Sequence, residues 1–210
     1  MNRPLLSFLL ASALLASLSF AEQSLPRLQP TYAPKPFTAQ EREYFGGGCS
    51  WYCGAPGVRV SSTSTLEERN GLKHPAQQAH DFKLQTVWSE GAAGVGAGEK
   101  LSFEFITTKE STTNLAVTSC VIAAGHQANE KLFRQNARPK TLQLFIDGRP
   151  AALLELTDSM GLQHFNLPKV RLERPSRHTI AFQILDAYPG SKFQDTCITE
   201  INFSGEGDMH

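Results

Sequence analysis

The sequence lacks the features by which most enzymes and membrane proteins are recognised. Its 210 residues contain no Gly-x-Ser-x-Gly nucleophile elbow and no His-Glu-x-x-His helix motif. Beyond the first 21 residues, no segment is apolar enough to span a membrane. Apolar residues nowhere recur with a helical period over three turns, so long helices are not expected. These absences favour a β-rich, non-catalytic protein without a membrane span.

The glycine-rich stretch from Gly91 to Gly98 does not fit a nucleotide-binding loop. A dinucleotide-binding fingerprint that began at Gly94 would require a glycine at the position of Glu99. A P-loop requires Gly-Lys followed by Ser or Thr, whereas Gly98 is followed by Glu99 and Lys100. The next residues alternate like a strand, so no helix N-terminus is offered to a phosphate. A nucleotide cofactor is therefore not expected.

The sequence also lacks an excess of charge of either sign. Lysine and arginine total 20, and aspartate and glutamate total 20. Loss of residues 1–21 would leave 19 basic and 20 acidic residues, because Arg3 is the only charged residue among them. Proteins that bind nucleic acid or anionic membranes carry a basic excess. Neither is expected as a partner.

The N-terminus has the three parts of a signal peptide. Arg3 supplies a basic start, an apolar run extends to Phe20, and the small residues Ser19 and Ala21 precede a cleavage point. We expect residues 1–21 to be removed on export and the mature protein to be periplasmic or secreted. Residue 22, directly after the cleavage point, is Glu and not Cys, which argues against a lipid anchor.

The remaining chain has the length of one domain. Residues 22–43 contain four prolines and no apolar periodicity, which predicts an extended, mobile linker. We expect the ordered domain at residues 44–205 and a short tail at residues 206–210.

Cysteine is scarce, with four residues that allow three disulfide pairings. Export favours oxidation to two disulfides. Cys49 and Cys53 are close enough to bridge locally, whereas Cys120 and Cys197 each fall within a predicted strand. We therefore expect the pairs Cys49–Cys53 and Cys120–Cys197. A zinc site is the alternative, but it lacks a second Cys pair or a His pair at ligand spacing.

The sequence does contain short runs of apolar residues or of alternating apolar and polar residues. Each is bounded by Gly, Pro, Asn or Asp, as expected of an all-β sandwich. Asp147-Gly148 predicts a hairpin between two of them. The predicted strands are Val58–Ser62, Leu101–Ile106, Leu115–Ile122, Thr141–Asp147, Ala151–Leu156, Leu162–Leu167, His178–Leu185 and Cys197–Phe203.

The stretch that begins at His80 predicts a loop with oxygen ligands. Asp81 and Thr86 supply oxygens and Trp88 supplies an apolar anchor, an arrangement that suits a structural calcium ion. An Asx turn without metal is the alternative. Glu200 interrupts the apolar last strand, where a carboxylate requires a partner. That partner is either a cation shared with the Asp81 loop or a Lys or Arg side chain.

Two aromatic residues lie between the first two cysteines. Trp51 and Tyr52 follow three glycines and either form a platform for sugar rings or fold back into the core. Sandwich modules bind ligands through loops at one end. We therefore expect Trp51 and Tyr52 to lie near the binding surface, together with Arg138 and Lys140 of the predicted loop after Asn136.

Three classes of function remain open on the residues alone. A binding module is favoured. A small hydrolase could use His80 and Asp81 with Glu90, but neighbouring residues of an extended segment point to opposite faces. An adaptor between envelope proteins would use the same loops on a protein surface.

Three spaced motifs resemble a known family. They are Asp81-x4-Thr-x-Trp-x-Glu-Gly-x2-Gly-x-Gly-x-Gly-Glu99, Asn136-x-Arg-Pro-Lys140 and Asp186-x-Tyr-Pro-Gly-x-Lys-Phe-x-Asp-Thr-Cys-Ile-x-Glu-Ile201. In order and spacing they are similar to the discoidin-like (F5/8 type C-like) domain found beside bacterial NAD glycohydrolases. The resemblance covers about residues 45–205. It departs from the family at Asp81-Phe82, where Asp-Gly or Asp-Asn is usual, and at Gly125-His126, where Gly-Tyr is usual.

The resemblance implies a galactose-binding-like jelly roll with a non-catalytic role. It implies binding to glycans or to a cell surface, with an envelope protein as the alternative partner. It also implies a structural Ca²⁺ ion at the position of Asp81, Thr86 and Glu200.

Overall fold

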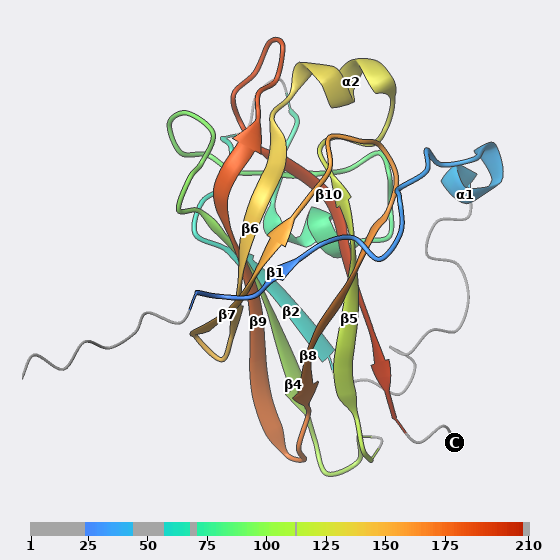
Figure 1. Cartoon of the computed structure of the whole chain (residues 1–210), viewed down its shortest axis with the longest axis vertical. Helices are drawn as coiled ribbons and strands as arrows, with labels where there is room; N and C mark the ends of the chain where they lie inside the picture. The colour runs from blue at the N-terminus through green and yellow to red at the C-terminus, as the bar shows by residue number, and fades with distance from the viewer. Residues whose placement is uncertain (1–23, 44–56, 68–70, 112, 208–210) are drawn as a thin grey trace, which may run out of the picture.

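The chain folds into two β-sheets that pack face to face (Figure 1). The structure is a computed structural model that describes residues 24–43, 57–67, 71–111 and 113–207. Neighbouring strands are antiparallel except for the pair β1 and β7. The six-stranded sheet has the order β1 (Arg27–Leu28), β7 (Arg149–Glu155), β6 (Arg138–Ile146), β9 (Ser176–Tyr188), β4 (Lys100–Thr107) and β2 (Gly57–Ser62). The four-stranded sheet has the order β3 (Trp88–Ser89), β10 (Cys197–Glu206), β5 (Ala116–Ala124) and β8 (Gln163–Arg171).

Helices contribute little to the described fold. They are α1 (Ala39–Glu43), the 3-10 helix η2 (Ala76–His80) and α2 (Glu130–Gln135). Within the described ranges, none is long and apolar enough to cross a membrane. The prediction of an all-β sandwich without long helices is confirmed.

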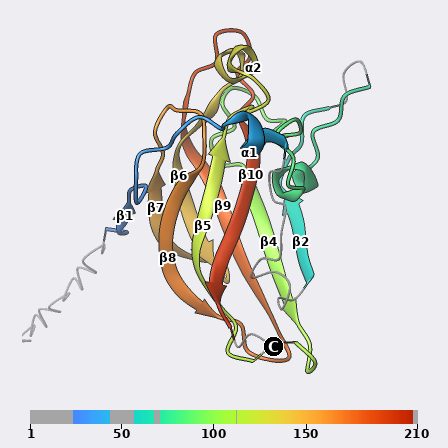
Figure 2. The same cartoon turned by 90° about the vertical axis from the view of Figure 1, so that its right-hand side faces the viewer.

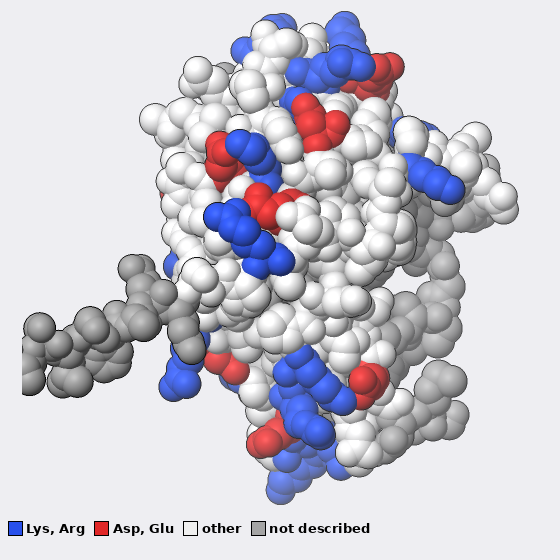
Figure 3. All heavy atoms as spheres, viewed as in Figure 1, with Lys and Arg blue, Asp and Glu red and all other residues white. Residues whose placement is uncertain are grey.

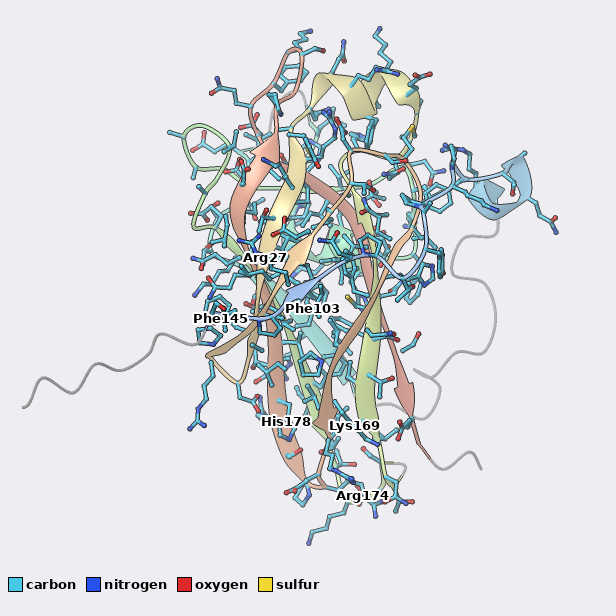
Figure 4. The ribbon with its side chains drawn as sticks, viewed as in Figure 1. Arg27, Phe103, Phe145, Lys169, Arg174 and His178 are labelled. Atoms are coloured by element: carbon cyan, nitrogen blue, oxygen red, sulfur yellow. The ribbon has the colours of Figure 1, made fainter. Side chains whose placement is uncertain are left out.

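Aromatic rings join the two sheets across the core. Buried and half-buried residues alternate along β4, which directs Phe103 and Phe105 inward. Both rings meet Phe203 of the opposite sheet edge-on, with centroid distances of 5.0 and 5.1 Å. Phe103 lies in the interior between the sheets (Figure 4).

Every predicted strand lies on an observed one, because the period-two pattern is local. The predicted hairpin at Asp147-Gly148 is also confirmed, with φ angles of 49° and 77°. β6 begins at Arg138, earlier than predicted, so the expected loop after Asn136 is part of a strand. Pro139 is tolerated there because the β6–β9 register shifts between Pro139 and Thr141.

The predicted mobile linker is wrong for residues 24–43, which we call the strap. The amide of Leu153 donates to the carbonyl of Pro26 at 2.8 Å, and the amide of Thr31 donates to the carbonyl of His164 at 2.8 Å. The strap thus begins with β1 beside β7, crosses β8 and ends with α1 (Figure 2). Proline removes its own N–H donor but not the acceptors and donors around it, so a proline-rich segment can still cover a sheet edge.

The predicted Cys120–Cys197 disulfide is also wrong, and both residues are buried free thiols. Cys120 pairs with Phe203, whereas Cys197 lies six residues earlier on β10 and pairs with Ser89. At about 3.3 Å per residue the two sites are roughly 20 Å apart. A disulfide requires Cα atoms within about 7 Å. Burial raises the pKa of the Cys197 thiol to about 12. The predicted pair Cys49–Cys53 lies outside the described residues.

We predict that Gly161→Ala releases the strap. Gly161 has a φ of 107°, and an added Cβ would lie 1.9 Å from the carbonyl oxygen of Lys35. Gly148→Ala is the matched control, since Gly148 also has a positive φ of 77° but no atom within 4 Å of the added Cβ. We expect faster tryptic cleavage within residues 24–43 in Gly161→Ala only. Equal protection of the strap in both variants would contradict its packing against Gly161.

Candidate functional site

A pocket of about 320 Å³ opens at the end of the sandwich where β5 ends and β10 begins. We call it the loop-end pocket. Its polar and aromatic lining includes His74, His126, Asn136, Phe193 and Asp195. Its apolar walls come from Leu66, Leu72, Val87 and Leu132. An apolar pocket with a few convergent polar groups is typical of small-ligand sites.

Backbone hydrogen bonds to β10 and α2 position the residues of this pocket. The amide of Gly125 donates to the carbonyl of Cys197 at 2.9 Å, which fixes the turn that carries His126. The amide of Phe193 donates to the carbonyl of Gln135 at 2.8 Å, at the C-terminal end of α2. The ring of Phe193 therefore lies on an anchored loop, half-buried at the pocket.

One ring nitrogen in each of the two imidazoles of this pocket lacks a hydrogen-bond partner. The Nδ1 atoms of His74 and His126 are buried without a hydrogen-bond partner. Burial and the neighbouring His74 lower the pKa of His126 to about 4, so that its ring is neutral at pH 7. A neutral imidazole has one donor and one acceptor nitrogen. Buried polar groups are normally paired, and these two atoms have no partner among the described residues.

The Asp81 loop and β10 bring together the three residues predicted to bind calcium. The Thr86 hydroxyl donates to both carboxylate oxygens of Asp81 at 2.9 Å. The amide of Phe82 donates to Glu200 Oε2 at 2.9 Å. The amide of Lys83 also donates to Asp81 Oδ1 at 3.1 Å, so the loop has an Asx turn as well.

Glu200 is wholly buried and only partly satisfied. Its Oε1 atom has no hydrogen-bond partner, and the nearest cationic candidate, His80 Nδ1, is 3.7 Å away. Burial, with a smaller effect of Asp81, raises the pKa of Glu200 to about 8. No Lys or Arg side chain of the described residues pairs with it. A carboxylate oxygen without a partner, beside a second carboxylate and a threonine, fits a cation with oxygen ligands such as Ca²⁺. The described residues contain no cluster of three His, Cys, Asp or Glu side chains arranged for a metal ion, so the remaining ligands would be hydroxyl, carbonyl or water oxygens.

Arg138, predicted to lie near the binding surface, already has protein partners for its guanidinium group. Only 8% of Arg138 is exposed, and its Nε and Nη2 atoms donate to Asp158 at 2.5 and 2.6 Å. Its Nη1 atom donates to the carbonyls of Asn136 and Pro189 at 3.1 and 3.2 Å, and the guanidinium lies 4.8 Å from the centroid of Phe133. Arg138 therefore holds the strands and loops of this end together.

The other predicted contacts remain predictions. Lys140 is exposed and pairs with Asp186 at 2.6 Å. Trp51 and Tyr52 lie outside the described residues. Charges of both signs are interspersed over much of the face in Figure 3, as the balanced composition predicts.

The residues of the alternative acid–base site have separate partners. The carboxylate of Glu90 accepts from the amides of Thr196 and Ala92 at 3.0 and 2.7 Å. His80 Nδ1 instead lies 2.8 Å from the carbonyl oxygen of Ile201. Glu90 thus stabilises a loop, and nothing in these contacts supports a hydrolase.

Comparison with solved structures shows the same fold in carbohydrate-binding modules. The structure of the CBM32-1, CBM32-2 and M60 catalytic domains from Clostridium perfringens ZmpB has a TM-score of 0.53 at 12% identity, over 90% of this chain. The CBM32-1 and CBM32-2 domains of that protein in complex with GalNAc have a TM-score of 0.50 at 12% identity, over 87% of this chain. This chain spans only 17% and 41% of those two chains. Among curated proteins, no match was found.

A family model covers most of the described sandwich. It is that of the NAD glycohydrolase translocation F5/8 type C domain, and it matches residues 51–204. The two-sheet architecture and the neighbouring structures agree with this match. The chain therefore belongs to the family of NAD glycohydrolase translocation F5/8 type C domains.

Proposed function

We propose that this protein is an exported, non-catalytic module that binds a glycan in the loop-end pocket. The observation that supports this most is the pocket of about 320 Å³, whose apolar walls surround two histidines, an asparagine and an aspartate. A sugar has adjacent hydroxyl groups that both donate and accept, so it can pair with ring nitrogens of both histidines. The Asp195 carboxylate at the same pocket is a further acceptor for hydroxyl groups.

The aromatic ring at this pocket supports a sugar over other polar ligands. Phe193 offers an apolar ring beside the polar groups, and the C–H face of a pyranose packs on such a surface. The related fold of modules solved with GalNAc makes N-acetylgalactosamine the first ligand to test.

The signal-like segment at residues 1–21 supports export to the periplasm or beyond the cell. Trp51, Tyr52 and Lys140 are proposed to extend the binding surface. An envelope protein that binds the same loops is the alternative, and it is distinguished by binding that free sugars do not inhibit.

We propose in addition that Asp81, Thr86 and Glu200 hold a structural Ca²⁺ ion. The ion would displace the proton that the raised pKa leaves on Glu200 near pH 7. It would then bind Oε1 and compensate the charges of Asp81 and Glu200. It would tie the Asp81 loop to β10 and so support the same end of the sandwich, with no direct role in sugar binding.

The variant His126→Phe distinguishes a binding role of His126 from a structural one. His126→Phe keeps a ring but removes the unpaired nitrogen, so we expect sugar affinity to fall about tenfold or more. Stability should stay equal or rise, because a buried unsatisfied atom is removed. Isothermal titration with N-acetylgalactosamine and with hits from a glycan array gives the affinity, and thermal unfolding gives the stability.

Phe193→Ala provides a second test of the same pocket, with Leu185→Ala as the matched control. Leu185 is an exposed apolar side chain on β9. We expect affinity to fall only in Phe193→Ala. Unchanged sugar binding in both His126→Phe and Phe193→Ala would exclude the loop-end pocket.

Calcium is predicted to raise the melting temperature of the wild type, and a chelator to reverse the effect. A metal that binds only the folded state contributes about 2.7 kcal/mol at a hundredfold excess over Kd. Glu200→Gln should abolish this response. Glu90→Gln, which alters another buried carboxyl group, should retain it. A melting temperature that ignores both calcium and chelator would rule out the metal site.

The pKa of Glu200 predicts a pH dependence for the metal-free protein. The folded pKa of about 8 lies above the ordinary value of 4.5, so the folded state holds this proton more tightly than the unfolded state. The contribution to stability is complete below pH 4.5 and is lost as the pH rises towards 8. Its slope approaches about 1.4 kcal/mol per pH unit. Glu200→Gln should flatten this decline in chelator-treated protein, as measured by denaturant unfolding at several pH values. An unchanged slope in the variant would assign the pH dependence to other groups.

A further inference from the structure

We propose that the strap forms a second saccharide site, which takes an acidic sugar. Where the strap crosses β8 there is a cavity of about 350 Å³. The residues that matter for binding are Tyr32, Lys35, Thr38, Leu162 and His164. The family model matches residues 51–204, so the strap side of this cavity lies outside the matched domain.

An exposed aromatic ring forms the floor of this site. Tyr32 is 54% exposed, although the strap around it is bonded to the sheet. One side of its ring lies against His164, with centroids 4.4 Å apart and a tilt of 39°. The exposed part of the side chain offers an apolar surface beside the phenol hydroxyl. Such a surface suits the C–H face of a pyranose ring.

The charge around this cavity selects for an acidic sugar. Among the described residues that line it, Lys35 alone is charged, and the residue is exposed. Burial lowers the pKa of His164, so that ring is neutral at pH 7 and adds no charge. The loop-end pocket differs, because Glu67 and Asp195 line it. A carboxylate-bearing sugar is therefore favoured at the strap and disfavoured at the loop end.

The site is held in place before any ligand binds. The amide of Thr31 donates to the carbonyl of His164, and Gly161 lies directly against the Lys35 carbonyl. Further along the strap, Arg42 Nη1 donates to the carbonyl of Gln127 at 2.8 Å. Anchors on both sides limit the entropy that the strap would lose on binding, which favours affinity.

The experiment compares 3′-sialyllactose with lactose by isothermal titration of the full mature chain. We expect the wild type to bind sialyllactose at least about tenfold more tightly at the strap than Lys35→Gln does. Tyr32→Ala should lose about tenfold in affinity for sialyllactose. The matched controls are Lys109→Gln and Leu185→Ala, which change an exposed lysine and an exposed apolar residue elsewhere. Added salt should weaken sialyllactose binding in the wild type and much less in Lys35→Gln.

This proposal shares the ligand class of the proposed function but fails independently of it. Wild-type sialyllactose affinity in both Tyr32→Ala and Lys35→Gln would overturn the strap site. So would an absence of sialyllactose binding in the wild type. If Phe193→Ala loses N-acetylgalactosamine binding but keeps its affinity for sialyllactose, the result supports the strap as a separate site. Loss of sialyllactose binding in Phe193→Ala alone would assign the acidic sugar to the loop-end pocket and overturn the strap site.

Discussion

The burial of β10 on both faces constrains the rest of the structure. Its residues from Cys197 to Ile201 are all buried, and the strand pairs with β3 on one side and β5 on the other. Phe203 meets the rings of the opposite sheet, and Glu200 accepts the amide of Phe82. The Cys197 carbonyl accepts the amide of Gly125 and so fixes the turn that carries His126. A shift of one residue in this register would turn every side chain of β10 to the opposite face of the sheet. It would disrupt the core, the Asp81 loop and the loop-end pocket.

The sequence predicted those features that depend on short-range patterns. Each predicted strand was found because alternation and bounding turn residues are local signals. The grouping of Asp81, Thr86 and Glu200 was also predicted, because a carboxyl group within an apolar strand requires a partner. The short helix α2 was missed although it has a local signal. The side chain of Asn129 caps it by accepting from the amide of Leu132 at 2.9 Å.

The errors concern features that depend on register and burial. Cys120 and Cys197 were paired because both lie on strands, but the distance between them is decided by which residues face each other across β5 and β10. Arg138 was expected on a loop but begins a strand, and no local pattern indicates that Asp158 pairs with it. The strap was predicted to be mobile because its composition resembles a linker. Its order comes from contacts with β7 and β8, which lie more than 100 residues away in sequence.

The buried polar groups of this fold divide into those with hydrogen-bond partners and those without. Arg138 and Glu90 have protein partners for their polar atoms, and they hold loops in place. The Nδ1 atoms of His74 and His126 and the Oε1 atom of Glu200 do not, and the Oδ1 of Asn202 and the Oε1 of Gln78 are the other such atoms among the described residues.

Each buried polar group without a hydrogen-bond partner lowers the free energy of unfolding by about 1–3 kcal/mol. This is a sizeable part of the marginal stability of a small domain. A ligand that supplied a hydrogen-bond partner to both histidines would remove this destabilisation, and the free energy gained would contribute to its affinity. A well-paired residue such as Arg138 offers no such gain, because a ligand could bind it only by displacing partners that are already in place. The strap site differs because Tyr32 and Lys35 are exposed and are already solvated. A ligand there must gain its affinity from new contacts. Under these two proposals, the loop-end pocket would be the more selective site, and the strap would add affinity for charged glycans.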